Sequence, residues 1–303
     1  HAIERHIDSI LALPVIDVAA IRARRFHVAL DCVRGAGGVA IPPLLDRLAV
    51  RMSGIHLEPD GRFPHPPEPV PENLQDLGRL VRDTRADLGL AVDPDVDRLA
   101  LVDETGAAIG EDYTLALAVR AVLGADGNRD ARPVVVVNLS TSLVVEDAAR
   151  DHGARFLRAP VGEANVARAI RDEGAVIGGE GNGGVILPAL HIGRDAPLGV
   201  ALILHYLAKV GGSLSGVVAG SPRYVILKAK GPRGPELGPL YDRLRRRFPD
   251  ASADDRDGLR LAWRDRWLHV RPSGTEPIVR LIAEAPTAAD AEALVSAARE
   301  PMT

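Results

Sequence analysis

The chain has 303 residues, of which 46% are hydrophobic and 26% are charged, so it can bury real cores and is neither disordered nor fibrous. Its net charge of −4 argues against a nucleic-acid partner, because a basic excess marks that function. No apolar run approaches the roughly 18 residues of a membrane span, which argues against a membrane partner. The single cysteine, Cys32, excludes an internal disulfide and fits a cytoplasmic location.

The first third of the chain alternates apolar runs with turn-forming segments. Its patterns predict a helix over residues 2–12, a strand over 26–31, a helix over 41–48, a helix over 74–81, and strands over 88–92 and 99–102. Six prolines between Pro59 and Pro71 indicate an exposed, extended connection.

The remaining chain divides into two further parts. Up to residue 220, strands (134–137, 155–157, 175–178) alternate with helices (113–123, 143–149, 165–171, 196–209). The tail predicts strands over 224–228, 259–263, 267–271 and 278–283, with helices over 237–248 and 288–298. The fold class is therefore α/β: two consecutive layered α/β domains with mixed sheets (1–110 and 111–220), followed by a small α+β C-terminal domain (221–303). The first two share an order of elements that suggests two copies of one unit.

An acidic loop, Asp93-Pro-Asp95-Val-Asp97-Arg98, separates two apolar strands. Three carboxylates at alternate positions repel one another, and a hard divalent cation such as Mg²⁺ relieves this. The adjacent Arg98 could reach a phosphate or a sugar oxygen. An EF-hand loop ending at Glu104 is a weaker alternative, because the sixth position holds Arg98 instead of glycine and the flanks read as strands.

Two glycine-containing segments complete the set of candidate sites. Gly178-Gly-Glu180-Gly-Asn182-Gly-Gly184 follows an apolar strand, and its glycines allow close approach of a ligand to Glu180 and Asn182. Arg271-Pro-Ser273-Gly274-Thr275-Glu-Pro277, followed by Arg280, combines hydroxyls, backbone N–H groups and guanidinium groups into a possible phosphate cradle. Taken alone, each could also be an ordinary turn.

The three motifs, in this order, resemble the metal, sugar and phosphate loops of the α-D-phosphohexomutases, the phosphoglucomutase and phosphomannomutase superfamily. The turn at residues 31–38 and the loop at 161–166 are also similar to family segments. The residues of the 161–166 loop, with those of the sugar loop, are most similar to the sequences of members called phosphoglucosamine mutases. The resemblance covers essentially the whole chain.

The resemblance implies a reversible transfer of phosphate between O6 and O1 of a hexose, through a phosphoserine and a bisphosphorylated sugar. By the same resemblance, Asp93, Asp95 and Asp97 hold Mg²⁺ and the catalytic Arg98 lies beside the transferring group. Sugar hydroxyls are bound by Glu180 and Asn182, with Gly162 and Glu163 nearby. The resemblance also implies that Arg271, Ser273, Gly274 and Thr275 bind the non-reacting phosphate, with Arg280 as a weaker candidate.

Three departures from the family pattern matter. Val96 replaces the common glycine of the metal loop, so we expect its backbone to avoid positive φ. Gly184 stands where many members have histidine. No segment resembles the first domain with its nucleophilic serine loop, and Ser140 to Ser142 are interpreted as helix N-caps.

Because the chain begins with His1, we expect a fragment whose serine-bearing domain lies upstream and which is inactive alone. The alternative is a non-catalytic sugar-phosphate-binding protein that has lost this domain. A phosphatase that uses an aspartate nucleophile is weaker, because no further motif supports it.

Overall fold

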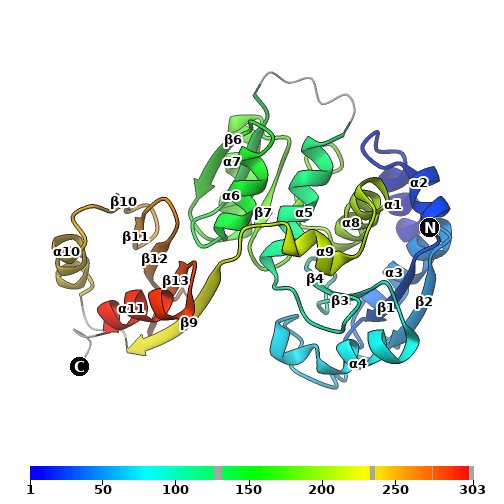
Figure 1. Cartoon of the computed structure of the whole chain (residues 1–303), viewed down its shortest axis with the longest axis horizontal. Coiled ribbons are helices and arrows are strands. Elements are labelled where there is room, and N and C mark those ends of the chain that lie inside the picture. The colour runs from blue at the N-terminus through cyan, green and yellow to red at the C-terminus, as the bar shows by residue number, and fades with distance from the viewer. Residues whose placement is uncertain (126–131, 233–235, 275, 300–303) are drawn as a thin grey trace.

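The computed structural model describes residues 1–125, 132–232, 236–274 and 276–299, arranged around three β-sheets (Figure 1). The first sheet contains β1 (His27–Asp31), β2 (Arg51–Ile55), β3 (Leu88–Val92) and β4 (Leu99–Val102) in the order β2-β1-β3-β4. The second contains β5 (Val134–Asn138), β6 (Arg155–Ala159), β7 (Ile177–Glu180) and β8 (Gly184–Ile186) in the order β6-β5-β7-β8. In each sheet three strands are parallel and the last is antiparallel, which confirms the mixed sheets and the duplicated unit.

Helices cover both faces of these two sheets. Around the first sheet lie α1 (Ala2–Leu11), α2 (Val18–Arg24), α3 (Gly37–Arg47), the 3-10 helix η1 (Pro71–Asn73) and α4 (Gln75–Thr84). The second unit contributes α5 (Asp112–Leu123), α6 (Leu143–Arg150), α7 (Glu163–Glu173), α8 (Ala196–Val210) and α9 (Leu214–Ala219).

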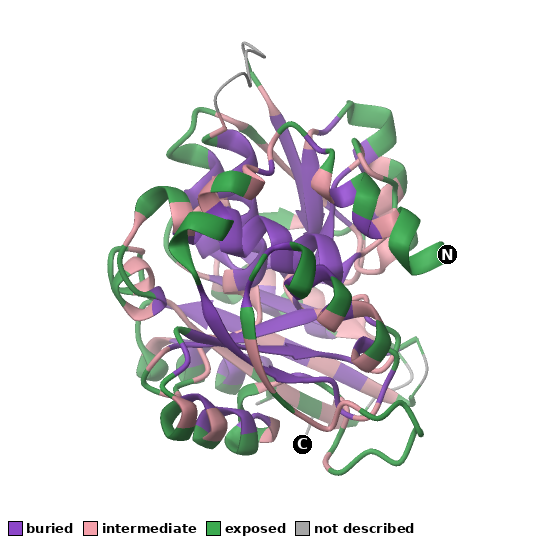
Figure 2. Cartoon of the chain, turned by 90° about the vertical axis from the view of Figure 1, so that its right-hand side faces the viewer, coloured by how far each residue is buried: buried purple, intermediate pink, exposed green. Residues whose placement is uncertain are grey.

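One hydrophobic core joins the two sheets. Along β1 the side chains alternate: Val28 and Leu30 enter this core, whereas Ala29 packs on the α4 side. The same core includes Leu115 of α5 and Ile203 of α8, and these two helices pack against each other between the sheets. Figure 2 shows these inner strands and helices as buried. Since each buried Leu or Ile contributes roughly 1.5–3 kcal/mol, this shared core is the main mechanical link between the two units.

The third sheet is antiparallel throughout and lies at the far end of the molecule (Figure 1). Its order is β10-β11-β12-β13-β9, built from β9 (Val225–Pro232), β10 (Ser252–Asp254), β11 (Leu259–Ala262), β12 (Trp267–Pro272) and β13 (Ile278–Ala285). The helices α10 (Gly238–Arg247) and α11 (Ala288–Arg299) bury one apolar face, as expected for a small α+β unit. Because strand residues alternate, the polar side chains of His269, Arg271 and Arg280 share the opposite face.

That opposite face contacts the second unit through buried polar groups. The carboxylate of Glu284 accepts hydrogen bonds from the Ser142 hydroxyl and from the Leu143 N–H, the latter at 2.8 Å. His269 Nδ1 lies 2.8 Å from the Ser140 hydroxyl, and its Nε2 lies 2.7 Å from the Asp257 carbonyl oxygen. These bonds hold the third sheet against the N-terminus of α6.

The structure corrects several sequence expectations. Ser142 caps α6, as predicted, but Ser140 contacts His269 instead of capping a helix. Helix α3 begins at Gly37, four residues earlier than expected. The sequence did not predict β2, β8, β10, α2 or α9. Among the described residues, no helix combines the length and the apolar character needed to cross a membrane.

The buried His269 predicts a pH dependence of stability. Burial lowers the pKa of His269 to about 4, below the value of about 6.5 in an unfolded chain. Its neutral form therefore contributes fully above pH 6.5, and this contribution is lost as the pH falls towards 4. Between these values, we expect the free energy of unfolding of the wild type to fall more steeply than that of His269→Gln, by up to about 1.4 kcal/mol per pH unit.

Urea denaturation at a series of pH values measures this difference. The exposed His152 provides the control, because His152→Gln should retain the wild-type slope. Parallel slopes for wild type and His269→Gln would contradict the prediction.

Candidate active site

The carboxyl edges of the two mixed sheets face each other. The acidic loop follows β3 in the first sheet, and Glu180 ends the topologically equivalent β7 in the second. The Leu99 N–H, at the start of β4, donates to the Gly183 carbonyl oxygen at 3.0 Å. Ligands of open α/β sheets bind at the carboxyl ends of the strands, so this junction is where a ligand is expected.

The three aspartates of the acidic loop converge. One oxygen from each of Asp93, Asp95 and Asp97 lies within 4.8 Å of the others. Asp93 is fully buried, and its Oδ1 accepts the N–H groups of Asp97 and Arg98 at 3.0 Å each. Its Oδ2 accepts Arg98 Nε at 2.6 Å. The loop backbone thus fixes Asp93, and Asp93 in turn fixes Arg98.

Clustering and burial shift the acidity of this group. Burial and the neighbouring Asp93 raise the pKa of Asp97 to about 7. Burial also opposes ionisation of Asp93, but the backbone and side chain of Arg98 outweigh it and hold that pKa below its usual range. Asp97 Oδ1 is buried and has no hydrogen-bond partner among the described residues. A buried carboxylate oxygen that accepts no hydrogen bond from these residues, lies 3.6 Å from Arg98 Nε and stands beside two other carboxylates suits a hard divalent cation.

The expectation for Val96 was wrong. Val96 has φ +66°, in the left-handed region that β-branched residues rarely adopt. The loop requires this conformation so that the two following N–H groups turn towards Asp93. The Val96 carbonyl oxygen accepts the Ala196 N–H of α8 at 3.1 Å, which helps to hold the strained residue.

The EF-hand alternative is also wrong. The loop connects the antiparallel strands β3 and β4, not two helices. Glu104, the presumed last ligand, accepts hydrogen bonds from the backbone and hydroxyl of Ser215.

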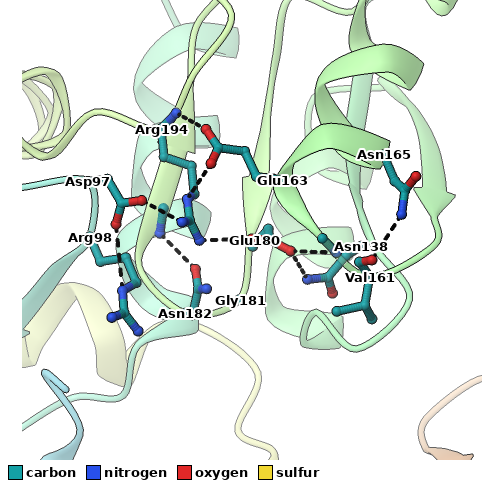
Figure 3. Close-up of polar contacts among 12 residues, drawn as sticks. Asp97, Arg98, Asn138, Val161, Glu163, Asn165, Glu180, Gly181, Asn182 and Arg194 are labelled. Carbon is teal, nitrogen blue, oxygen red and sulfur yellow. Dashed lines mark hydrogen bonds and ion pairs between the residues drawn. The ribbon is translucent and has the colours of Figure 1, made fainter. Parts of the chain in front are cut away.

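The glycine-rich loop is built around a buried glutamate (Figure 3). Glu180 Oε1 accepts hydrogen bonds from Asn138 Nδ2 at 2.9 Å and from the Gly162 N–H at 3.1 Å. Asn182 Oδ1 accepts the Gly184 N–H at 3.2 Å. The structure therefore brings the predicted sugar-site residues together, and Asn138, which ends β5, is an addition that the sequence reasoning missed.

Arg194 is the most important residue that the sequence did not reveal. Its guanidinium donates to Asp97 Oδ2 and, at 2.9 Å, to Glu180 Oε2. Its backbone N–H donates to Glu163 Oε1 at 3.0 Å (Figure 3). Arg194 thus connects the acidic loop to both segments of the sugar loop. A Cβ at Gly184 would lie 2.3 Å from Arg194 Cδ, so the glycine makes room for this side chain.

The arginine-containing loop lies at the end of β12. Ser273 is buried, and its hydroxyl accepts the Glu276 N–H at 3.3 Å, whereas Gly274 is exposed. Thr275 lies outside the described residues. Strand register places Arg271, Arg280 and Lys230 side by side across β12, β13 and β9. Lys230 had not been predicted.

Asp257 links this loop to the sugar site. Its Oδ2 accepts the Val161 N–H at 3.0 Å and lies 3.0 Å from Arg271 Nε. Val161 directly precedes Gly162, whose N–H reaches Glu180. The three predicted loops therefore lie along one continuous polar path, from Arg271 to Asp97.

Comparison with known proteins identifies the family. Family models of phosphoglucomutase/phosphomannomutase match in order: α/β/α domain II at residues 4–106, α/β/α domain III at 110–224 and the C-terminal domain at 242–300. The chain belongs to the phosphoglucomutase/phosphomannomutase family. The family that the sequence motifs resemble is thus confirmed, and the chain carries domains II, III and IV of that family.

Relatives within this family are longer. A probable phosphoglucosamine mutase of Methanopyrus kandleri is 38% identical over 94% of this chain and 62% of its own length. A phosphoglucomutase/phosphomannomutase of Thermococcus kodakarensis is 37% identical over 89% of this chain and 59% of its own length. A family structure from Burkholderia thailandensis superimposes with a TM-score of 0.80 and 27% identity, covering 94% of this chain and 64% of that chain. The chain therefore spans about three-fifths of the length of these relatives.

Proposed function

We propose that this chain is the metal-, sugar- and phosphate-binding part of a phosphohexomutase that interconverts hexose 6-phosphate and hexose 1-phosphate. The observation that carries the proposal is the continuous polar path from the acidic loop, through Arg194 and Glu180, to Arg271. Glucosamine phosphate is the proposed substrate, supported by the names of relatives such as the one from Methanopyrus kandleri. We assign metal binding to residues 1–110, sugar binding to residues 111–220 and phosphate binding to residues 221–303.

Asp93, Asp95 and Asp97 are the proposed Mg²⁺ ligands. Asp97 offers its Oδ1, which accepts no hydrogen bond from the described part of the chain, because Arg194 already occupies its Oδ2. A bound Mg²⁺ supplies positive charge that stabilises a phosphoryl group during transfer. Arg98, held by Asp93 at 2.6 Å, presents a second positive charge to the same group. The phosphoserine of the family mechanism would come from a domain outside this chain.

The sugar is bound between the two mixed sheets in this proposal. Glu163 and Asn182 are partly exposed and can bond sugar hydroxyls, whereas Glu180 is buried and positions Gly162 and Arg194. Because a hexose must turn around between the two transfers, donors and acceptors on several loops suit both orientations better than one tight pocket.

The non-reacting phosphate is bound by the third sheet. Arg271, Arg280 and Lys230 lie directly opposite one another across three strands, and like charges in such pairs are destabilising. Asp257 and Glu276 offset part of this charge, through contacts of 3.0 Å to Arg271 and 3.5 Å to Arg280. A phosphate dianion beside Ser273 and Gly274 would offset the rest.

A mutase assay tests the function directly. The product of the full gene, supplied with Mg²⁺ and a hexose bisphosphate primer, should interconvert glucosamine 6-phosphate and 1-phosphate faster than the glucose or mannose phosphates. The 303-residue chain alone should be inactive, because it contains no recognisable serine loop. Turnover of about 1 s⁻¹ or more by this chain alone would contradict the fragment assignment. Binding without turnover by the full product would favour the non-catalytic binder.

Calorimetry tests the metal site. Mg²⁺ should bind the wild type weakly, because the phosphoserine ligand is absent, and Asp95→Ala should bind at least about tenfold more weakly since one of three carboxylates is lost. Asp95 is exposed, so its removal should not disturb folding. The matched control is Asp83→Ala, which removes an exposed aspartate from α4. Identical heats for wild type and Asp95→Ala would reject the site.

Ligand binding tests the phosphate site. A charge-assisted hydrogen bond contributes roughly 1.5–3 kcal/mol, so Arg271→Ala should bind glucosamine 6-phosphate about 10- to 150-fold more weakly, with or without Mg²⁺. Arg271→Lys should restore only part of the lost affinity, because lysine lacks the planar guanidinium that matches two phosphate oxygens. Arg264→Ala, at an exposed turn of the same sheet, should bind like the wild type. Wild-type affinity in Arg271→Ala would show that the loop is only a hairpin turn.

A further inference from the structure

A second group of potential metal ligands lies at the carboxyl edge of the first sheet. Asp31 ends β1, His56 follows β2, and His65 belongs to the proline-rich segment, which spans residues 59–71. Asp31 Oδ1 lies 3.0 Å from His56 Nδ1, and Asp31 Oδ2 lies 3.1 Å from His65 Nε2. One ligand atom from each residue lies within 4.8 Å of the others. The proposed mutase chemistry uses none of these three side chains.

The surroundings of His65 point to a cation. Its Nδ1 lies 2.9 Å from the Pro66 carbonyl oxygen, which can only accept, so Nδ1 carries a proton. Its Nε2 faces the Asp31 carboxylate, which is also an acceptor. An imidazole that donates from Nδ1 can present the lone pair of Nε2 to a cation shared with Asp31. An N–H donated to a carbonyl from the opposite nitrogen is the usual outer contact of a metal-bound histidine.

The placement of the three side chains suits a shared cation. Around a tetrahedral Zn²⁺, with bonds of about 2.0–2.2 Å, neighbouring ligand atoms lie roughly 3.3–3.5 Å apart. His56 Nδ1 lies 3.0 Å from Asp31 Oδ1, and His65 Nε2 lies 3.1 Å from Asp31 Oδ2, so each imidazole contacts a different oxygen of the carboxylate. One ligand atom from each residue lies within 4.8 Å of the others, so small side-chain rotations would bring all three to the spacing of a bound ion. Asp31 is 2% exposed, whereas the His56 and His65 side chains are 22% and 17% exposed, which leaves a path from solvent.

We propose that Asp31, His56 and His65 bind a Zn²⁺-type cation that fastens the proline-rich segment to the first sheet. Two imidazoles and one carboxylate select first-row transition metals over Mg²⁺, which prefers oxygen ligands. The site is therefore chemically distinct from the acidic loop, and it stands whether or not the mutase assignment holds.

A second histidine group in the chain has a different explanation. His6 and His191 both contact the same oxygen of Asp195, Oδ2, at 2.7 and 2.8 Å. The other oxygen caps α8 by accepting the Leu198 N–H at 2.8 Å. The hydrogen bond to Asp195 raises the pKa of His6, as in an ordinary ion pair. Because both histidines here share one carboxylate oxygen, whereas His56 and His65 contact different oxygens of Asp31, His191 provides an internal control.

A cation that holds the proline-rich segment would also position Glu68 beside Arg98. Glu68, three residues after His65, lies 3.7 Å from Arg98 Nη1. The turn that follows Asp31 also supports the acidic loop, because the Ala36 N–H donates to the Pro94 carbonyl oxygen at 2.8 Å. A cation at Asp31 would therefore hold the segment in place beside Arg98.

Metal titration tests the proposal. After chelator treatment, the chain is titrated with Zn²⁺ by calorimetry and with Co²⁺ by visible absorption, both in excess Mg²⁺. Wild type and His191→Ala should each bind with a stoichiometry near one. His56→Ala and His65→Ala should bind at least about 100-fold more weakly, because each loses a direct ligand. Unchanged affinity in the His56→Ala/His65→Ala double variant, or no Zn²⁺ binding by the wild type at micromolar concentration, would overturn the site.

Proteolysis gives a second, independent measurement. Arg62 and Phe63 are exposed in the proline-rich segment, so trypsin should cut between them. Zn²⁺ should slow this cut in the wild type and leave the rate in His65→Ala unchanged, which also controls for inhibition of trypsin itself. Equal protection in both proteins would show that the cation does not act through His65. Circular dichroism of each variant verifies that the fold is retained.

Discussion

A single guanidinium group connects the parts of this molecule that are proposed to act together. Arg194 contacts Asp97 of the acidic loop and Glu180 of the glycine-rich loop, which lie 97 and 14 residues away in the chain. Its N–H also fixes Glu163. Removing the arginine would leave the buried Glu180 carboxylate without its charge partner, and an uncompensated buried charge is costly. This contact therefore joins the two mixed sheets at the site, together with the backbone hydrogen bond from Leu99 to Gly183, while the core around α5 and α8 joins them elsewhere.

The duplicated topology explains why acidic groups meet here. β3 and β7 occupy equivalent positions in sheets of the same order, so Asp93, after β3, and Glu180, at the end of β7, lie at equivalent edges. Asp31 and Asn138 likewise end the equivalent strands β1 and β5. Where these edges face each other, the Arg194 guanidinium donates both to Asp97 of the acidic loop and to Glu180. Positive charge is then required between them, and Arg194 and Arg98 supply it.

Sequence patterns predicted most of this fold because buried elements carry a regular pattern of apolar residues. Strands β3 and β4 are buried along their whole length and were predicted with their observed bounds. The missed strands are edge strands: β2 has no fully buried residue, and β8 and β10 have three residues each. Such strands are defined by backbone pairing, which leaves little trace in hydrophobic pattern.

For the candidate site, sequence could predict only what is local. The acidic loop and the glycine-rich loop are contiguous motifs, so their residues were found. Arg194, Asp257 and Lys230 belong to no motif, and their roles come from partners brought close by folding. Val96 was misjudged for a related reason. Its positive φ is imposed by hydrogen bonds to Asp93 and by α8, and a general preference of valine cannot reveal this.

The two ends of the polar path carry opposite electrostatic strain. At one end, burial and the neighbouring Asp93 raise the pKa of Asp97 to about 7. At the other end, Arg271, Arg280 and Lys230 repel one another across the third sheet. In the proposed function, a divalent cation would relieve the first strain and a phosphate would relieve the second. A phosphorylated sugar spanning the path would thus be oriented by charge before any hydroxyl is recognised, because its phosphate is repelled by the acidic loop unless a cation is bound there.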